Sequence, residues 1–179
     1  MNLRLKRTPG IYVVGFMASG KSTIGRHLAH RLGWSFFDTD DEIVAAEKCA
    51  IADIFATRGE AEFRRIEAEI LRQHVRWIER GRPAVLALGG GAFTIEANRA
   101  LVADNGISLW LDCPFDRVQQ RLTRPDEAPV RPLARDPETF AKLFETRRAH
   151  YALADLRIPI DTDDVERTVE QILLHPALR

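Results

Sequence analysis

Short apolar runs recur along the chain, separated by longer segments in which apolar residues return every three or four positions. Each run is short and mostly apolar, as are the strands of a parallel sheet that helices cover on both faces. The runs lie at Ile11–Val14, Ser35–Phe37, Ala84–Leu88, Ile107–Leu111 and Leu156–Ile160. Because strand-like and helix-like segments alternate and no linker or internal repeat divides them, the pattern predicts one domain, residues 1–179, of the α/β class with a parallel sheet.

The segments between these runs have the period of amphipathic helices. The first helix begins at Lys21 and ends before Gly33, a residue type that readily adopts the left-handed conformation after a helix. Its apolar face is formed by Ile24, Leu28 and Leu32. Further helices are predicted from Gly59 to about Arg80 and at Glu96–Ala103, Pro114–Leu122, Pro137–Leu153 and Val165–Leu174.

Residues Thr123–Asp136 (TRPDEAPVRPLARD) form the one substantial irregular segment, with three prolines and neither a helical nor a strand period. Irregular segments of this length in a compact domain are usually binding loops or lids. The segment therefore predicts a mobile lid.

Composition narrows the function classes. Hydrophobic residues make up 45% and charged residues 29% of the chain, which is typical of a folded domain. The 26 Lys and Arg balance 26 Asp and Glu, so no overall basic field favours nucleic acid. No apolar stretch approaches the length of a membrane span, the first ten residues contain no apolar segment, and the two cysteines lie far apart. We expect a cytoplasmic protein with reduced thiols that binds neither membrane nor nucleic acid.

Residues Gly15–Ser22 (GFMASGKS) fit the pattern G-x-x-x-x-G-K-[ST], directly after an apolar strand and at the start of a helix. The glycines allow backbone amides to curl around phosphate oxygens, and the helix N-terminus adds partial positive charge. Lys21 is placed to reach the β- and γ-phosphates, and the Ser22 hydroxyl is placed for Mg²⁺. The motif predicts a nucleoside triphosphate site.

Two carboxylates, Asp38 and Asp40, follow the run Ser35–Phe37. They should emerge beside the phosphate loop, and alternation along an extended chain would send both side chains the same way. One could then approach the metal while the other faces an acceptor hydroxyl. The alternative is an N-cap, in which Asp40 or Asp41 begins a helix at Glu42–Glu47; this cluster alone does not separate the two readings.

Two further groups suit an anionic acceptor. Three glycines, Gly89–Gly91, follow a buried strand and expose backbone amides to a ligand, although a permissive turn would explain them too. The arginine pairs Arg64-Arg65 and Arg147-Arg148 carry planar guanidinium groups that can grip a carboxylate. The alternative for the first pair is a solvated helix face, with Arg65 pairing with Glu69.

Taken in order, the motifs resemble the shikimate kinase family, small ATP-dependent enzymes of aromatic amino-acid biosynthesis. The likeness covers nearly the whole chain: GFMASGKST, FFDTD, IADIF, GEAEFRRIE, LALGGGA, VRPL and R-x-x-x-Y. It implies a three-layer α/β/α P-loop kinase fold with strand order 2-3-1-4-5, and transfer of the ATP γ-phosphoryl group to the 3-hydroxyl of shikimate, with Mg²⁺ as cofactor. It also implies an acceptor-binding region at about residues 40–75 and a lid at about residues 123–136. A monomer is the default expectation.

The resemblance assigns roles to residues. Asp38 and Ser22 would support Mg²⁺, and Asp40, Lys21 and Arg131 would be catalytic. The ATP-binding residues that it implies are Ala18, Ser19, Gly20, Lys21, Ser22, Thr23, Arg121 and Arg131. The shikimate-binding residues that it implies are Asp40, Arg64, Gly89, Gly90, Gly91 and Arg147, with Phe55 and Phe63 walling the ring.

Three departures from the family pattern affect the loop and the lid. Ala18 stands where relatives often have glycine, the lid is about three residues longer than in familiar members, and Ala134 replaces a leucine. Two other functions remain open at this stage: a gluconate or nucleoside monophosphate kinase of the same architecture, and a non-catalytic ligand sensor.

Overall fold

The computed structural model describes residues 10–123 and 136–178, and five parallel strands run through them. Their order is β2-β3-β1-β4-β5, so the expected α/β class and strand order are confirmed. The strands are β1 (Gly10–Val14), β2 (Ser35–Asp38), β3 (Ala84–Ala87), β4 (Gly106–Asp112) and β5 (Leu156–Pro159).

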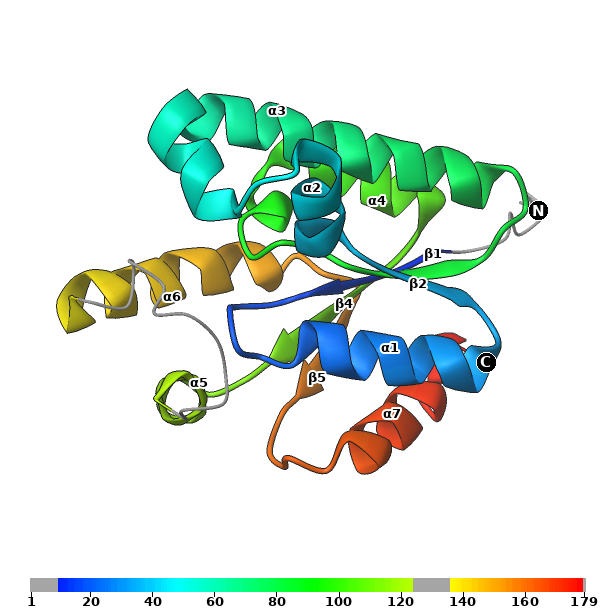
Figure 1. Ribbon diagram of the computed structural model, residues 1–179. Coiled ribbons are helices and arrows are strands. Elements are labelled where there is room, and N and C mark those ends of the chain that lie inside the picture. Colours follow the sequence, from blue (N-terminus) through cyan, green and yellow to red (C-terminus); the bar gives the residue numbers. More distant parts are fainter. Residues whose placement is uncertain (1–9, 124–135, 179) are drawn as a thin grey trace.

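Helices cover both faces of the sheet, which gives the three layers visible in Figure 1. One face carries α1 and α7, and the opposite face carries α3 and α4. The helices are α1 (Lys21–Leu32), α2 (Thr39–Glu47), α3 (Ile51–Glu79), α4 (Glu96–Asn105), α5 (Phe115–Leu122), α6 (Pro137–Tyr151) and α7 (Val165–Leu173), with short 3-10 turns η1 (Ala92–Thr94) and η3 (Pro176–Leu178).

The central strands supply the core because both of their faces are covered. Every residue of β1 and β3 is buried, and so are the last five residues of β4. This burial accounts for runs that are apolar at successive positions instead of alternating. Edge strand β2, whose residues are exposed or half-buried, is correspondingly mixed in sequence.

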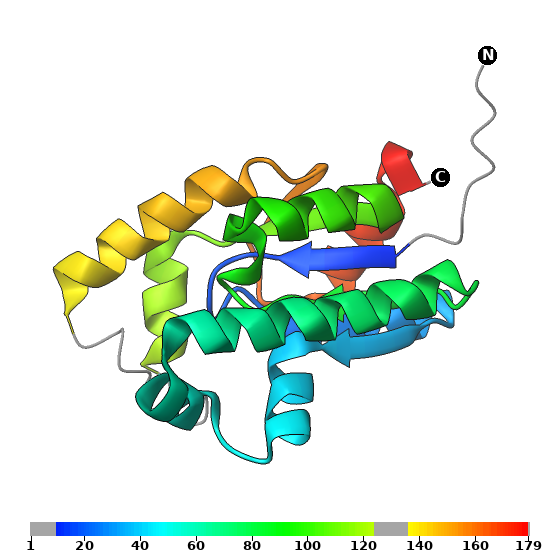
Figure 2. The ribbon, with the colours of Figure 1, turned by 90° about the horizontal axis from the view of Figure 1, so that it is seen from above.

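Strand β1 pairs with β3 on one side and β4 on the other, so the connections from its carboxyl end leave a crevice there. Figure 2 shows the arrow of β1 pointing toward the end of the molecule at which α5, α6 and the first turns of α3 gather. Ligands of open α/β sheets bind at this edge, where β1 leads into the Gly15–Ser22 loop, β2 ends at Asp38 and β3 leads into Gly89–Gly91.

Two local expectations were wrong. Helix α2 begins at Thr39 instead of Glu42, and its N-cap is Asp38, whose side chain accepts a hydrogen bond from the Asp40 amide; neither Asp40 nor Asp41 is the cap. Helical structure also begins at Ile51, and Gly59, expected to open that helix, interrupts it with φ 80° and ψ 173°. Gly33 is left-handed at φ 67°, as expected.

The expected lid falls almost wholly outside the described residues, and Arg131 and Ala134 lie outside them as well. At its ends, Thr123 follows α5, and Asp136 caps α6 by accepting a hydrogen bond from the Glu138 amide. No helix within residues 10–123 and 136–178 is long and apolar enough to cross a bilayer.

Candidate active site

The loop from β1 to α1 curls back on itself. Gly15, Ala18 and Gly20 have positive φ values of 149°, 57° and 96°. A Cβ on Gly15 would lie 2.9 Å from the Leu111 carbonyl oxygen, so this position requires glycine both for its conformation and for its close neighbour. Ala18 adopts the left-handed conformation that its glycine-bearing relatives reach without a steric cost. The loop thus has the curl that a phosphate-binding backbone needs.

Lys21 and Ser22 extend from the first turn of α1. The Lys21 ammonium donates a hydrogen bond to the Phe16 carbonyl oxygen at 2.9 Å, which holds its Nζ against the loop. The Ser22 hydroxyl donates to one carboxylate oxygen of Asp38, and the other oxygen of Asp38 accepts from the Asp40 amide. Asp38 is therefore both the N-cap of α2 and the partner of Ser22.

Asp40 faces the site, but from a helix and not from the extended strand that we expected. Because α2 begins at Thr39, Asp40 lies in a helical first turn and not on an extended strand, so the alternation argument was wrong. Its carboxylate nevertheless approaches the glycine triplet: a Cβ on Gly89 would lie 2.6 Å from Asp40 Oδ1 and 2.8 Å from Glu67 Oε1. Two carboxylates therefore converge on the face of Gly89.

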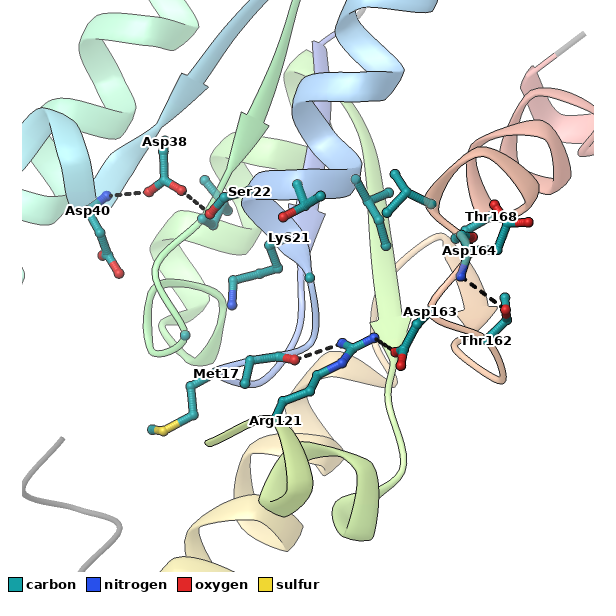
Figure 3. A pocket seen from close by; sticks show the side chains of 17 residues that line it. Met17, Lys21, Ser22, Asp38, Asp40, Arg121, Thr162, Asp163, Asp164 and Thr168 are labelled. Atoms are coloured by element: carbon teal, nitrogen blue, oxygen red, sulfur yellow. Dashed lines mark hydrogen bonds and ion pairs between the residues drawn. The ribbon is translucent and has the colours of Figure 1, made fainter. Parts of the chain in front are cut away.

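A cavity of about 430 Å³ joins the phosphate loop to this acidic cluster (Figure 3). Among the residues predicted from sequence, those lining it are Ala18, Gly20, Lys21, Ser22, Thr23, Asp38, Asp40, Gly90 and Arg121. Ser19 is wholly buried, and its amide donates to the Phe16 carbonyl oxygen within the loop. The fold thus brings the expected nucleotide side and the expected transfer site into one space.

The far wall of the cavity comes from the segment between β5 and α7, which sequence reasoning missed. Thr162, Asp163 and Asp164 line it. Asp163 accepts a hydrogen bond from Arg121 at 2.7 Å, and Arg121 also donates to the Ala18 carbonyl oxygen at 2.8 Å (Figure 3). The hydrogen bond from Arg121 to Asp163 lowers the pKa of this carboxyl. The segment leaves the carboxyl end of a parallel strand, and that position was the available signal.

Arg64 faces the glycine triplet from α3. Its guanidinium donates to Glu67 at 2.8 Å and to Glu60 at 3.3 Å. A Cβ on Gly91 would lie 2.7 Å from the Arg64 Cζ, so only glycine lets the guanidinium approach this closely. The solvated-face alternative is therefore wrong for Arg64. It holds for Arg65, which is exposed, although Arg65 pairs with Glu62 and not with Glu69.

Glu67, which sequence reasoning did not single out, is 1% exposed, and its Oε1 has no hydrogen-bond partner among the described residues. Burial raises the pKa of Glu67, while the Arg64 guanidinium opposes that rise. For Arg64, burial lowers the pKa, but the carboxylates of Glu67 and Glu60 outweigh it and the net direction is upward. In the sequence, Arg64 and Glu67 have the spacing of a common ion pair on a helix surface. The sequence therefore gives no sign that this pair is buried.

The second arginine pair divides between two environments. Arg147 points at the triplet, since a Cβ on Gly90 would lie 3.1 Å from Arg147 Nη1. Arg148 instead binds buried Asp112 at 3.1 Å, and Arg157 binds the same carboxylate at 2.8 Å. Only Arg147 therefore stands with Arg64 around Gly89–Gly91.

The two phenylalanines expected to wall the acceptor ring pack against each other beside Arg64. The rings of Phe55 and Phe63 lie 4.6 Å apart, with Phe63 buried and Phe55 partly exposed. The Arg64 Cζ lies 5.1 Å from the centre of the Phe63 ring. A flat, partly apolar acceptor with one carboxylate would meet both an aromatic surface and two guanidinium groups here.

A phosphate loop, an acidic pair and a glycine triplet faced by two guanidinium groups, at the carboxyl edge of a five-stranded parallel sheet, are typical of a P-loop phosphotransferase. Comparison with known proteins specifies the family. A family model described as shikimate kinase matches residues 17–175. The chain belongs to the shikimate kinase family, whose members are ATP-dependent phosphotransferases.

Individual relatives agree with this membership over most of the chain. It is 40% identical to a shikimate kinase of Cereibacter sphaeroides, covering 94% of this chain and 80% of that protein. It is 37% identical to one of Persephonella marina, covering 91% and 96%. A structure of shikimate kinase from Acinetobacter baumannii in complex with shikimate has a TM-score of 0.81 and 35% identity, covering 92% of this chain and 90% of that one.

Proposed function

We propose that this chain transfers the γ-phosphoryl group of ATP to the 3-hydroxyl of shikimate, giving shikimate 3-phosphate and ADP. The single observation that carries the proposal is the arrangement of the site. Asp40 lies at the junction between the phosphate-loop cavity and a glycine triplet faced by Arg64 and Arg147. Family membership supports the same reaction.

The phosphate loop would hold the nucleotide by its backbone. The residues we assign to ATP are Ala18, Ser19, Gly20, Lys21, Ser22, Thr23, Arg121 and Arg131. Lys21 would exchange its contact with the Phe16 carbonyl for phosphate oxygens and stabilise the charge that develops on them. Arg121, held between the Ala18 carbonyl and Asp163, would lie against the adenine. Arg131 lies outside the described residues, and its assignment to the transferring phosphate rests on the resemblance.

Ser22 and Asp38 fit a magnesium ion. Mg²⁺ prefers oxygen ligands and usually takes one or two protein groups together with substrate phosphates. The Ser22 hydroxyl and the Asp38 carboxylate are in direct contact beside Lys21, which is such a pair of donors. When bound, the ion would offset the negative charge of the phosphates.

The acceptor would lie with its carboxylate between Arg64 and Arg147 and its ring against Phe55 and Phe63. The amides of Gly89–Gly91 would face it across the short distances that the absence of side chains allows. Its 3-hydroxyl would then approach Asp40, which would orient it in line with the phosphate and accept its proton. Since little covalent chemistry falls to the protein, positioning and charge stabilisation supply most of the catalysis.

Further parts of the proposal concern the whole chain. We assign residues 1–179 to one domain with an acceptor-binding region at about 40–75 and a lid at about 123–136, most of which lies outside the described residues. We also propose that it acts as a monomer in the cytoplasm, without nucleic acid or membrane partners.

The test is ADP release from Mg-ATP by the purified protein, with shikimate, quinate, gluconate, nucleoside monophosphates or no acceptor. We expect release to depend on shikimate. Dependence on gluconate or a nucleotide would retain the nucleotide site and reject the acceptor assignment. ATP binding without turnover on any acceptor would favour a ligand sensor over an enzyme.

A further inference from the structure

Tyr151, the last residue of α6, contacts the middle glycine of the triplet. Its side chain is 2% exposed, and its hydroxyl donates a hydrogen bond to the Gly90 carbonyl oxygen. Arg147, one turn earlier on α6, approaches the same residue: a Cβ on Gly90 would lie 3.1 Å from Arg147 Nη1 and 3.7 Å from the Tyr151 hydroxyl. One turn of helix therefore places a cation beside Gly90 and holds its carbonyl with a neutral donor.

The environment of Tyr151 keeps that donor intact. Burial raises the pKa of the phenol, even though the nearby guanidinium groups of Arg147 and Arg64 act in the opposite direction. The hydroxyl therefore retains its proton across the physiological range. The ring packs beside Trp110 with 6.4 Å between ring centres, and the side chain has almost no exposed surface into which it could turn.

The hydrogen bond from Tyr151 to the Gly90 carbonyl also sets the direction of the Gly91 amide, because the two groups share one peptide bond. The Gly90 carbonyl and the Gly91 amide belong to one planar unit and point in opposite directions. A hydrogen bond that fixes the carbonyl fixes the amide as well. Fixing matters here because consecutive glycines have more backbone freedom than any other sequence. On the Gly91 side of this unit lies the Arg64 guanidinium, whose Cζ would be 2.7 Å from a Cβ on Gly91.

We propose that Tyr151 is a positioning residue for the acceptor: by holding the Gly90 carbonyl, its hydroxyl aims the Gly91 amide at the acceptor carboxylate between Arg64 and Arg147. This inference rests on the proposed function, because it names the carboxylate of that acceptor. Tyr151 itself does not touch the substrate.

The chain contains two tyrosines, which provides a matched experiment. Tyr151→Phe removes only the hydroxyl, which binds the Gly90 carbonyl and also contacts the Arg147 guanidinium; the Gly91 resonance described below separates the two contacts. Tyr12→Phe removes a hydroxyl that is equally buried but has no hydrogen-bond partner among the described residues. We expect Tyr151→Phe to raise the KM for shikimate about three- to tenfold, the usual range for one lost hydrogen bond, while the KM for ATP stays within twofold. Tyr12→Phe should change neither KM.

Two further measurements isolate the mechanism. In protein labelled with ¹⁵N-glycine, Tyr151→Phe should move the Gly91 amide resonance without any acceptor present. The methyl ester of shikimate, which lacks the anionic carboxylate, should inhibit wild type and Tyr151→Phe with inhibition constants that agree within twofold. The proposal is overturned by an unchanged KM for shikimate, by equal rises in both KM values, or by an ester that loses affinity as much as shikimate does. An inactive wild type would instead overturn the proposed function, and the Gly91 resonance would still decide the contact.

Discussion

Asp38 and Asp40 are two residues apart, yet their contacts differ. Asp38 is bonded on both carboxylate oxygens, to the Ser22 hydroxyl and to the Asp40 amide. Asp40 instead turns toward Gly89 and lines the cavity that contains the phosphate loop. The difference arises because the chain changes from strand to helix between them, which rotates the second side chain into the site.

Replacing Asp40 by Asn should reduce kcat by about 10²- to 10⁴-fold, because the amide cannot accept the acceptor's proton. The affinity for ATP should stay within a few-fold, since Asp40 is assigned to the acceptor. The exposed neighbour Asp41→Asn is the matched control and should retain full activity. Steady-state kinetics and nucleotide titration measure both quantities. A collapse of ATP affinity in Asp40→Asn would make this residue a support of the nucleotide or metal.

Arg64 and Arg65 allow a comparison between a site cation and a surface cation on one helix. Arg64→Ala should weaken shikimate binding by about 2–4 kcal/mol, because a desolvated carboxylate loses its partner. It should also lower the melting temperature, since Glu67 stays buried without its cation. Arg65→Ala removes only an exposed pair with Glu62 and should change neither quantity measurably. Calorimetric titration with shikimate checks the first expectation, and equal affinities for the two variants would reject the carboxylate-binding role.

At the scale of elements, the strands were predictable because burial on both faces leaves an uninterrupted apolar run, as in β1 and β3. The start of α3 was not, because its N-cap Ala50 makes no side-chain hydrogen bond and Gly59, a residue type expected at a helix boundary, lies inside it. The phosphate loop was predictable from spacing alone. Glu67 was not, because only the packing of α3 brings it to Gly89, whereas the Thr162–Asp164 segment had a signal in its position after the carboxyl end of β5.

The packing of α2 on α3 makes stability depend on pH through His74. Burial lowers the pKa of His74, against the opposing effect of Glu42 on α2, whose carboxylate is 3.6 Å from the ring. The ring also stacks on Phe37, with 4.2 Å between ring centres. The unfolded chain therefore binds a proton at a pH where the folded protein does not. The free energy of unfolding should fall as pH drops below the ordinary value of 6.5.

Urea unfolding at several pH values between 5 and 8 would measure this dependence. His74→Gln should show a shallower loss of stability toward acid than wild type, because one group that titrates differently in the two states is gone. His30→Gln, at an exposed position on α1, should keep the wild-type slope. Identical slopes for His74→Gln and wild type would mean that other groups dominate the acid response.

Within the described part of the whole molecule, two apolar clusters of unequal size form the core. The large one surrounds the sheet, and the small one lies between α2 and α3; its buried members are Ile43, Ile54, Phe63, Ile66 and Ile70. Helix α3 contributes residues to the small cluster from both sides of Gly59, which interrupts the helix with a φ of 80° that suits glycine. A region with its own small core and a break in its helix should open at a lower free energy than the sheet. The part that we assign to the acceptor should therefore be the less stable part of the described molecule.

Hydrogen exchange followed by mass spectrometry tests this directly. Without ligands, amides of α2 and of residues 51–58 should exchange earlier than those of β1 and β3, because the sheet amides open only with the large core. Shikimate alone should slow exchange in α2 and around Arg64, because we expect it to bind this region only when the region is folded. A non-hydrolysable ATP analogue alone should protect residues 15–22 and leave residues 51–58 unchanged. If each ligand protects residues 15–22 and residues 51–58 equally, the two apolar clusters unfold as one unit. The proposed acceptor region would then have no local stability of its own.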